Sequence, residues 1–270
     1  MPVTANRDTQ LCMSMAARPG NFGVRFHNHL YRQLGLNFYY KAFAPNDLEG
    51  AVRGIRALGI RGCGVSMPFK EACVALVDEL DPSAAVIQSI NTIVNDAGHL
   101  KAYNTDYIAV SRLLGSHAVP RTRFALRGSG GMAKAVAFAL RDAGFTDGLI
   151  VARNEEAGRA LARSCGLRWQ AGLDGERPEL LVNVTPLGMA GPQVDELAFE
   201  QAAIDAAHTV FDVVATPADT PLIKAARALG KPVITGDQVA AIQALEQFVL
   251  YTGVRPTDTQ YLEAAAFARS

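Results

Sequence analysis

The chain has 270 residues, of which 49% are apolar, enough to bury the cores of two ordinary domains. Lysine plus arginine and aspartate plus glutamate number 26 each, so the formal net charge is zero. This balance gives no indication of a nucleic-acid or membrane partner, and no apolar run approaches the length of a membrane span.

Four cysteines occur, with no C-x-x-C pair and with spacings that fit no zinc site. They are Cys12, Cys63, Cys73 and Cys165. Three of them lie in apolar contexts typical of reduced core residues, and the N-terminus has no apolar signal segment. We therefore expect a cytoplasmic protein without a metal site.

Short β-rich runs alternate with helical patterns in residues 1–115. We expect strands at 11–17, 37–44 and 62–67 and helices at 21–34, 46–58 and 68–76. Asn46 is a candidate N-cap, with Glu49 completing a capping box, and Pro68 suits the first turn of the third helix. A hairpin around Asp96-Ala97-Gly98 and a helix from Thr105 follow. This alternation indicates an α/β layer domain.

A glycine turn joins an apolar strand to an alanine-rich helix in the second half of the chain. It reads Gly128-Ser129-Gly130-Gly131-Met132-Ala133, which meets the dinucleotide fingerprint in its G-x-G-x-x-A form. Glycine lets the backbone bend tightly and approach a pyrophosphate, whose charge the N–H groups of the helix start can hold. The spacing alone leaves open a strand-to-helix turn that binds no ligand.

Further apolar runs with helices between them predict a doubly wound parallel sheet from Phe124 to Gly236. Its later strands are expected at 149–152, 180–184, 210–214 and 232–235. Asn154 and Thr220 are candidate N-caps of two of its helices. We place a linker at 116–123, with an α/β domain at 1–115 and a Rossmann-type domain at 116–236.

The pattern of residues 237–270 predicts two helices split at Pro256, and this pattern alone allows them to pack on either domain.

The second strand of a dinucleotide fold usually ends in Asp or Glu, which binds ribose hydroxyls. Here it ends in Ala152-Arg153-Asn154, without a carboxylate. The guanidinium fork of Arg153 suits a 2′-phosphate, which favours NADP over NAD. A solvated surface arginine is the alternative.

Two short blocks in the first domain each follow an expected strand. Gly62–Lys70 ends in a lysine, and Tyr103–Asp106 ends in a carboxylate. An amine and a carboxylate brought together can take the proton of an alcohol while hydride leaves for a nicotinamide. Each residue also has an ordinary structural explanation, as a solvated lysine and as an N-cap aspartate.

With these blocks the chain resembles the shikimate dehydrogenases over nearly its whole length. The matching pieces occur in that family's order: His27-Asn28, Pro68-Phe69-Lys70, Ile90-Asn91-Thr92, Asn104-Thr105-Asp106, Gly128-Ser129-Gly130-Gly131, Arg153, Asn183 with Gly188-Met189, Thr220-Pro221-Leu222, and Gln243. Many ordered matches make the resemblance specific. It implies an enzyme of aromatic amino acid biosynthesis, in the chorismate pathway, that is a monomer or a homodimer.

The resemblance also implies roles for individual residues. Lys70 and Asp106 would be the catalytic pair, and the helices of 237–270 would complete the substrate domain. The substrate would contact Asn21, Gly23, Ser66, Asn91 and Gln243, with Asn91 and Gln243 on ring hydroxyls. NADP, with NAD as the alternative, would contact Gly128, Ser129, Gly130, Gly131, Met132, Ala133, Arg153, Asn154, Val213 and Gly236.

Several positions depart from the family pattern. Asn21 and Gly23 replace a Ser-x-Ser pair that binds the substrate carboxylate, and Gly64-Val65-Ser66 replaces Asn-Val-Thr. Ala215 stands where a tyrosine is expected, and Ala152-Arg153-Asn154 replaces Asn-Arg-Thr. These changes resemble the divergent, shikimate dehydrogenase-like branch. We expect Asn21 or Arg18 to meet the carboxylate instead.

The expected function is therefore NADP-dependent interconversion of shikimate, or a close cyclic hydroxy acid, and its 3-dehydro form. A first alternative keeps the fold and the Lys70–Asp106 pair but changes the substrate to quinate or an aminated shikimate analogue. A second alternative is a nucleotide-dependent sensor with weak or no catalysis. The missing serine pair and tyrosine favour the sensor slightly, whereas Lys70 and Asp106 argue against it.

Overall fold

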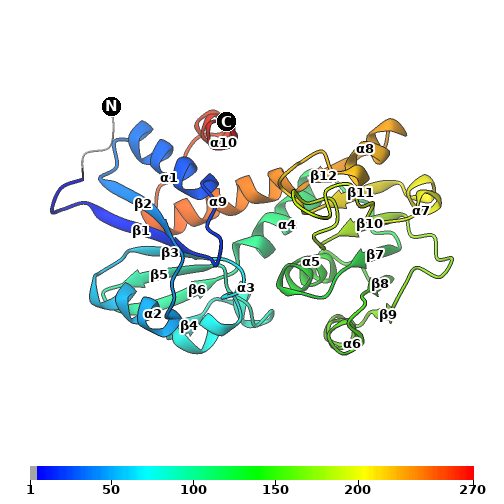
Figure 1. The fold of residues 1–270 in the computed structure, drawn as a ribbon, viewed down its shortest axis with the longest axis horizontal. Helices are drawn as coiled ribbons and strands as arrows, with labels where there is room; N and C mark the ends of the chain where they lie inside the picture. The colour runs from blue at the N-terminus through cyan, green and yellow to red at the C-terminus, as the bar shows by residue number, and fades with distance from the viewer. Residues whose placement is uncertain (1–4) are drawn as a thin grey trace. The chain divides into compact units, whose positions relative to one another are not determined.

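The structure, a computed structural model, describes residues 5–270, which form two compact units (Figure 1). The first unit contains the described residues up to Thr105 together with Gln243–Ser270, and the second is Asp106–Ile242. These divisions differ from the expected boundaries at 115/116 and 236/237. The first boundary follows the first residue of α4 (Thr105–Ser116), and the second lies within α9 (Gly236–Thr252). Each of these helices therefore has residues in both units.

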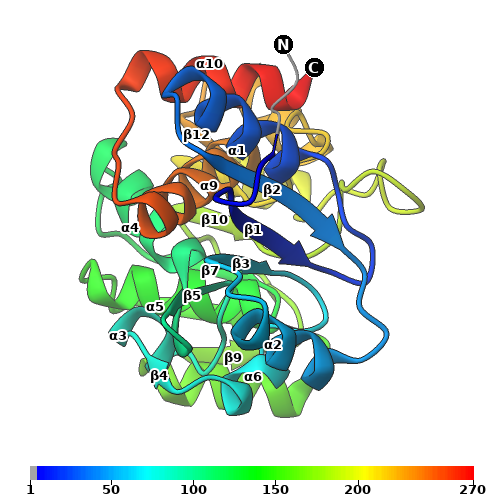
Figure 2. The ribbon, with the colours of Figure 1, turned by 90° about the vertical axis from the view of Figure 1, so that its left-hand side faces the viewer.

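The first unit is built on a mixed six-stranded sheet in the order β2-β1-β3-β5-β6-β4. Its strands are β1 (Gln10–Met15), β2 (Phe38–Phe43), β3 (Gly62–Val65), β4 (Glu79–Leu80), β5 (Thr92–Asp96) and β6 (His99–Tyr103). Its helices are α1 (Phe22–Gln33), α2 (Leu48–Ala57), α3 (Pro82–Ala85) and α10 (Asp258–Arg269), with a 3₁₀ turn at Ala72–Leu76. Helices α1, α9 and α10 lie on one face of the sheet and α2 on the other (Figure 2).

Strands β5 and β6 form the expected hairpin. They pair antiparallel from Thr92↔Tyr103 to Asp96↔His99. The two turn residues, Ala97 and Gly98, both have positive φ, 51° and 93°, as a tight hairpin requires for its twist to match that of the strands. Because of this turn, Asn91 and Thr105 lie just beyond the paired ends of the hairpin, next to each other in space.

Two local expectations for the first unit are wrong. The N-cap of α2 is Asp47, which accepts a hydrogen bond from the Gly50 N–H at 2.8 Å, so Asn46 does not cap this helix. The helix expected at 68–76 is a turn followed by the 3₁₀ turn. The backbone carbonyl of Lys70 accepts from the Ile90 N–H at 3.0 Å, a tertiary contact that replaces the bond a helix would make there.

The second unit has a six-stranded sheet in the order β12-β11-β10-β7-β8-β9, and every pair in it is parallel. Its strands are β7 (Phe124–Arg127), β8 (Gly148–Val151), β9 (Arg168–Gln170), β10 (Leu180–Asn183), β11 (Thr209–Asp212) and β12 (Val233–Thr235). Counted from β7, the order is 6-5-4-1-2-3, which is the Rossmann order with its reversal between β7 and β10. This confirms the expected doubly wound fold, although β9 was not expected.

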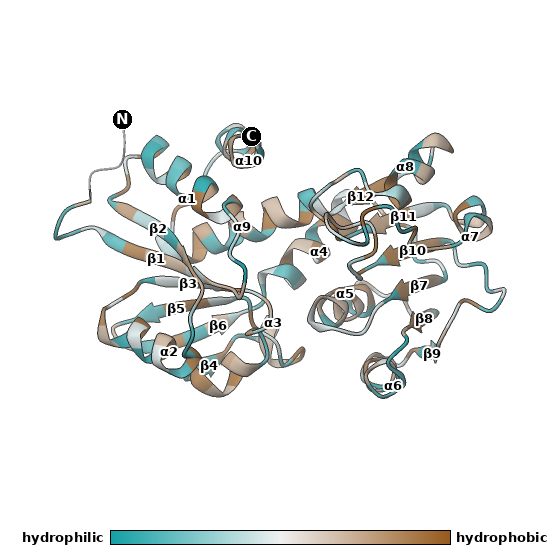
Figure 3. Cartoon of the chain, in the orientation of Figure 1, coloured by the Kyte–Doolittle hydropathy of each residue, from teal (hydrophilic) through white to brown (hydrophobic). Residues whose placement is uncertain are grey.

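The helices of the second unit are α5 (Gly131–Asp142), α6 (Glu155–Cys165), α7 (Gln201–Ala206) and α8 (Pro221–Ala228). Asn154 caps α6 by accepting from the Ala157 N–H at 3.0 Å, and Thr220 caps α8 by accepting from the Ile223 N–H at 3.2 Å, as expected. The inner strands are buried along their length, and Figure 3 shows them as mostly hydrophobic. Within residues 5–270, no helix combines the length and the apolar character needed to span a bilayer.

Candidate active site

The first unit contains a pocket of about 220 Å³. Its walls come from the end of β1 and the loop that follows it, the start of α1, β2, the end of β3 with the turn that follows it, the segment before β5, and α9. The lining residues are Ser14, Ala16, Arg18, Pro19, Gly20, Phe22, Gly23, Tyr40, Gly64, Val65, Ser66, Lys70, Asn91, Gln243, Ala244 and Gln247. The volume suits a small ring compound.

Most of the substrate contacts expected from the sequence lie on this pocket. Its lining includes Lys70 and four of the five expected substrate residues, Gly23, Ser66, Asn91 and Gln243. Asn21 is not part of the lining: it is the exposed residue before α1, and its backbone carbonyl accepts from the Arg25 N–H. The pocket is lined at this point by Arg18, the other residue expected to meet a carboxylate.

The side chain of Asn91 is held in one orientation by the residues around it. Its Oδ1 accepts three hydrogen bonds, from the Thr92 hydroxyl at 2.8 Å, the Thr105 N–H at 2.8 Å and the Thr105 hydroxyl at 3.0 Å. Its Nδ2 is buried and has no hydrogen-bond partner among the described residues. Because the oxygen is fully used, the amide offers the pocket only N–H donors, which suit a hydroxyl or carboxylate oxygen of a ligand.

Asp106 follows Thr105 at the start of α4 and is 7% exposed. The residue before it, Thr105, donates two hydrogen bonds to Asn91 Oδ1. Lys70 lies in the turn after β3, where its backbone is held by Ile90. The two residues belong to different units, so their pairing stays a prediction.

Gly64, which replaces a family asparagine, has no room for a side chain. A Cβ there would lie 2.9 Å from the Tyr40 hydroxyl oxygen and 3.4 Å from Gln247 Nε2. Gln247 donates from Nε2 to the Asn91 carbonyl and to the Thr92 hydroxyl, both at 3.0 Å. The space beside Gly64 is thus occupied by Tyr40, Ser14 and Gln247.

Neither Tyr40 nor Gln247 was recognised from the sequence. Gln247 is four residues after Gln243 on α9, so both side chains emerge on one face of that helix, and this spacing was the signal available. Tyr40 is buried beneath the pocket and stacks on His27 with the ring centroids 4.4 Å apart. Burial lowers the pKa of His27 to about 3, so this histidine is a neutral packing residue at physiological pH.

The glycine turn of the second unit fits a dinucleotide pyrophosphate. Gly128 has φ +129°, and a Cβ there would lie 2.7 Å from Val184 Cγ2, across the point where the strand order reverses. Gly130 precedes α5, and a Cβ there would meet nothing within 4 Å, which leaves open space at the helix start. No acidic residue occupies the first turn of α5, so its N–H groups face no competing carboxylate.

The other expected cofactor residues differ in their exposure and in their contacts within the protein. Ser129, Gly131, Met132, Val213 and Arg153 are partly or fully exposed at the carboxyl edge of the sheet. Ala133 and Gly236 are buried, and a Cβ on Gly236 would lie 2.3 Å from the Val213 carbonyl oxygen. Asn154 uses its side-chain oxygen to cap α6, so that oxygen is already engaged within the protein.

Asp212, at the end of β11, organises the loops at this edge and was not recognised from the sequence. Its Oδ1 accepts from Asn183 Nδ2 and the Val214 N–H, both at 3.0 Å, and its Oδ2 accepts from the Thr220 hydroxyl at 2.7 Å. Burial raises the pKa of Asp212 to about 6. A polar residue ending an apolar parallel strand was the only sequence signal.

Comparison with known proteins agrees with this architecture. A family model, the shikimate dehydrogenase substrate binding domain, matches residues 22–93. A shikimate dehydrogenase-like protein of Haemophilus influenzae is 53% identical over 267 residues, which cover 98% of each chain. The chain belongs to the shikimate dehydrogenase family. Its similarity to the "like" relative indicates the divergent branch, and family membership indicates an oxidoreductase.

Two solved structures similar to this chain carry ligands. A shikimate 5-dehydrogenase from Thermus thermophilus, in complex with NADP(H) and shikimate, has a TM-score of 0.86 and 30% identity and covers 96% of this chain and 100% of its own. A quinate dehydrogenase from Corynebacterium glutamicum, in complex with NAD, has a TM-score of 0.88 and 26% identity, with 95% and 98% covered.

Replacing Asp212 with asparagine tests its buried carboxyl group. Between pH 3.8 and about 6 the folded protein holds a proton on Asp212 that the unfolded chain has released, so this contribution to stability is lost as pH rises through about 6. The free energy of unfolding of the wild type should therefore fall relative to Asp212→Asn between pH 4.5 and pH 7. The expected fall is about 1.4 kcal/mol for each pH unit below the raised pKa, measured by urea unfolding. A difference that is the same at both pH values would contradict this assignment.

Proposed function

We propose that this protein is an NADP-dependent oxidoreductase that interconverts shikimate, or a close cyclic hydroxy acid, and the 3-dehydro form. The observation that carries the proposal is the chemistry of the pocket in the first unit. Among its described lining residues are two cations, Arg18 and Lys70, and three carboxamides, but no aspartate or glutamate. Such a lining favours a small anion with several hydroxyl groups.

The proposed reaction is an alcohol oxidation in which the acid–base pair handles the proton. The substrate hydroxyl gives its single proton to the acid–base pair of Lys70 and Asp106, and the carbon that bears this hydroxyl loses a hydride, so a carbonyl remains. NADP, when bound, accepts the hydride. Asp106 orients the amine and shares the proton, and the reverse reaction returns the proton to the alcohol oxygen.

Other pocket residues hold the ring. Asn91 donates from Nδ2 to a ring hydroxyl, because its oxygen is occupied by Thr92 and Thr105. Gln243 and Ser66 contact further ring hydroxyls from other walls of the pocket. Because these groups have fixed orientations, a compound that lacks the matching hydroxyl leaves a buried donor unpaired. Such a compound therefore binds less tightly than the substrate.

Arg18 is the proposed partner of the substrate carboxylate. It lines the pocket, and its side chain makes no hydrogen bond or ion pair with any residue in the described range 5–270. Gly23, beside it, leaves space where the family has a serine: a Cβ there would meet only Tyr40, at 3.6 Å. A planar guanidinium can bind a carboxylate through two parallel hydrogen bonds, which compensates for two lost hydroxyls.

The proposed cofactor contacts are those of the glycine turn, Arg153, Val213 and Gly236. Arg153, just after the end of β8, is an exposed cation where NAD-binding proteins of this fold carry an acidic residue. This supports NADP over NAD.

Quinate with NAD is the second candidate reaction, because the fold is comparably similar to the quinate dehydrogenase of Corynebacterium glutamicum. An aminated shikimate analogue uses the same catalytic pair. Turnover with each substrate and each nucleotide separates these reactions, and absence of turnover with all of them would favour the sensor alternative.

Loss of either member of the acid–base pair should abolish turnover. Lys70→Ala and Asp106→Ala should each lower kcat by roughly 10²- to 10⁴-fold, because a positioned acid–base group contributes about that factor. The measurement is the initial rate of NADPH formation, with circular dichroism to check folding. Near-normal turnover in both folded variants would reject the proposed roles.

Arg18→Gln should raise KM for shikimate by about 10-fold or more with a smaller change in kcat, because the carboxylate contact is the same in the ground and transition states. The matched control is Arg32→Gln, an exposed arginine on α1 that does not line the pocket. Equal KM values in the two variants would show that Arg18 does not hold the carboxylate.

A further inference from the structure

Arg127 has no role in the function described so far. It is the last residue of β7 and directly precedes Gly128. Its Nε is buried without a hydrogen-bond partner, and its guanidinium makes no ion pair within the described part of the chain. The guanidinium carbon lies 5.1 Å from the centre of the Phe199 ring. An arginine in this position retains unused donors beside the glycine turn.

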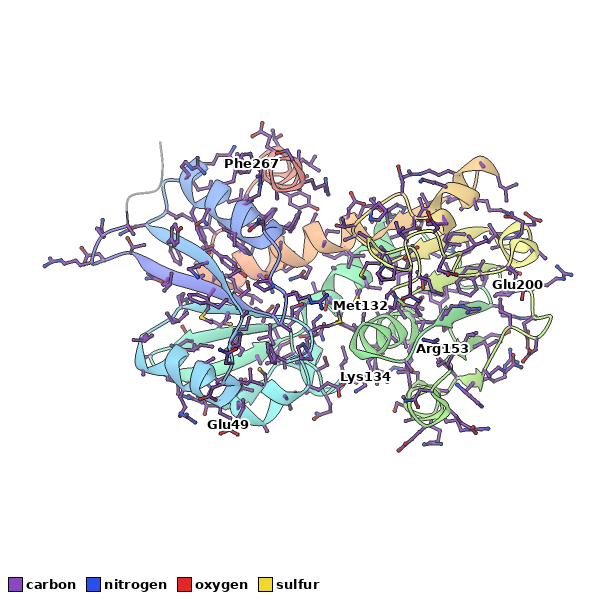
Figure 4. All side chains as sticks on the ribbon, viewed as in Figure 1. Glu49, Met132, Lys134, Arg153, Glu200 and Phe267 are labelled. Atoms are coloured by element: carbon purple, nitrogen blue, oxygen red, sulfur yellow. The ribbon has the colours of Figure 1, made fainter. Side chains whose placement is uncertain are left out.

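A second cation lies close to Arg127. Strand β8 runs beside β7 with Arg127 paired to Val151, so Arg153 emerges two residues further along at the same edge of the sheet (Figure 4). Burial lowers the pKa of the Arg127 guanidinium; the exposed carboxylate of Glu200 opposes this shift, and the charge of Arg153 adds to it. Two guanidinium groups that repel each other would both be stabilised by an anion bound between them.

The neighbouring positions explain why a second cation is needed. Of the sequence Ala152-Arg153-Asn154, which replaces the family's Asn-Arg-Thr, Ala152 has no polar side chain, and the Asn154 oxygen caps α6. Arg153 is therefore the only charged donor of that motif. Arg127 supplies a further fork of donors from the adjacent strand.

We propose that Arg127 and Arg153 together bind the phosphate monoester at the ribose 2′-position of an NADP-type dinucleotide. The proposal rests on the proposed function, because it assumes that a dinucleotide occupies the glycine turn. A phosphate monoester carries up to two negative charges and three acceptor oxygens, enough to pair with two guanidinium groups. Arg127 is thus a determinant of NADP over NAD.

The test is direct binding of NADPH and NADH, followed by nucleotide fluorescence, to the wild type and to Arg127→Gln. NADPH affinity should fall by about 10-fold or more in the variant, whereas NADH affinity should change by less than about twofold. The matched control is Arg123→Gln, which removes an arginine paired with Asp147 at the opposite end of β7. It should leave both affinities unchanged.

A second variant separates binding from folding. Arg127→Lys keeps the charge but loses the planar fork, so it should weaken NADPH by an intermediate factor and leave NADH unchanged. Unchanged NADPH affinity in Arg127→Gln, or an equal loss for NADPH and NADH in both variants, would overturn the proposal. A wild type that binds neither nucleotide would instead contradict the proposed function, and this inference with it.

Discussion

One carboxamide oxygen organises the pocket of the first unit. Asn91 Oδ1 collects three donors from Thr92 and Thr105, while the Asn91 backbone carbonyl accepts from the Val65 N–H at 2.7 Å and from Gln247 Nε2 at 3.0 Å. These bonds join β3, β5, the start of α4 and α9. Rotating the side chain would leave buried donors unpaired, a cost of several kcal/mol in total at about 1–3 kcal/mol for each. This constraint fixes the orientation of the amide, whose Nδ2 has no hydrogen-bond partner among the described residues and is the donor proposed for the substrate.

The second unit depends on a comparable constraint at the reversal of its strand order. Gly128 leaves no room for a Cβ beside the Val184 side chain, and Gly236 leaves none beside the Val213 backbone, so both loops need glycine at these points. Asp212 joins Asn183, Val214 and Thr220 beneath them. The loops at the edge proposed to hold a dinucleotide are therefore closely packed and hydrogen-bonded, and Arg127 and Arg153 place positive charge there.

Patterns that depend on neighbours in the sequence were predictable. Buried parallel strands appear as apolar runs, and the caps at Asn154 and Thr220 need only a polar side chain before a helical pattern. Contacts between distant segments were not predictable. Lys70 lies in a turn whose carbonyl accepts from the Ile90 N–H, and Asn21 is exposed outside the pocket although its neighbours in the sequence line it. Other strands and helices form the environments of Tyr40, Gln247 and Arg127, so no local pattern in the sequence indicates their roles.

The role of Asn91 is tested by the reduction of NADP by shikimate, measured in the wild type and in Asn91→Asp. The variant keeps an oxygen for the donors of Thr92 and Thr105 but replaces the Nδ2 donor with a charged acceptor. The wild type should form NADPH, and kcat/KM of the folded variant should be lower by at least about 100-fold, because the site then lacks the donor proposed for a substrate hydroxyl. A wild type that forms no NADPH, or a variant as active as the wild type, would contradict these expectations.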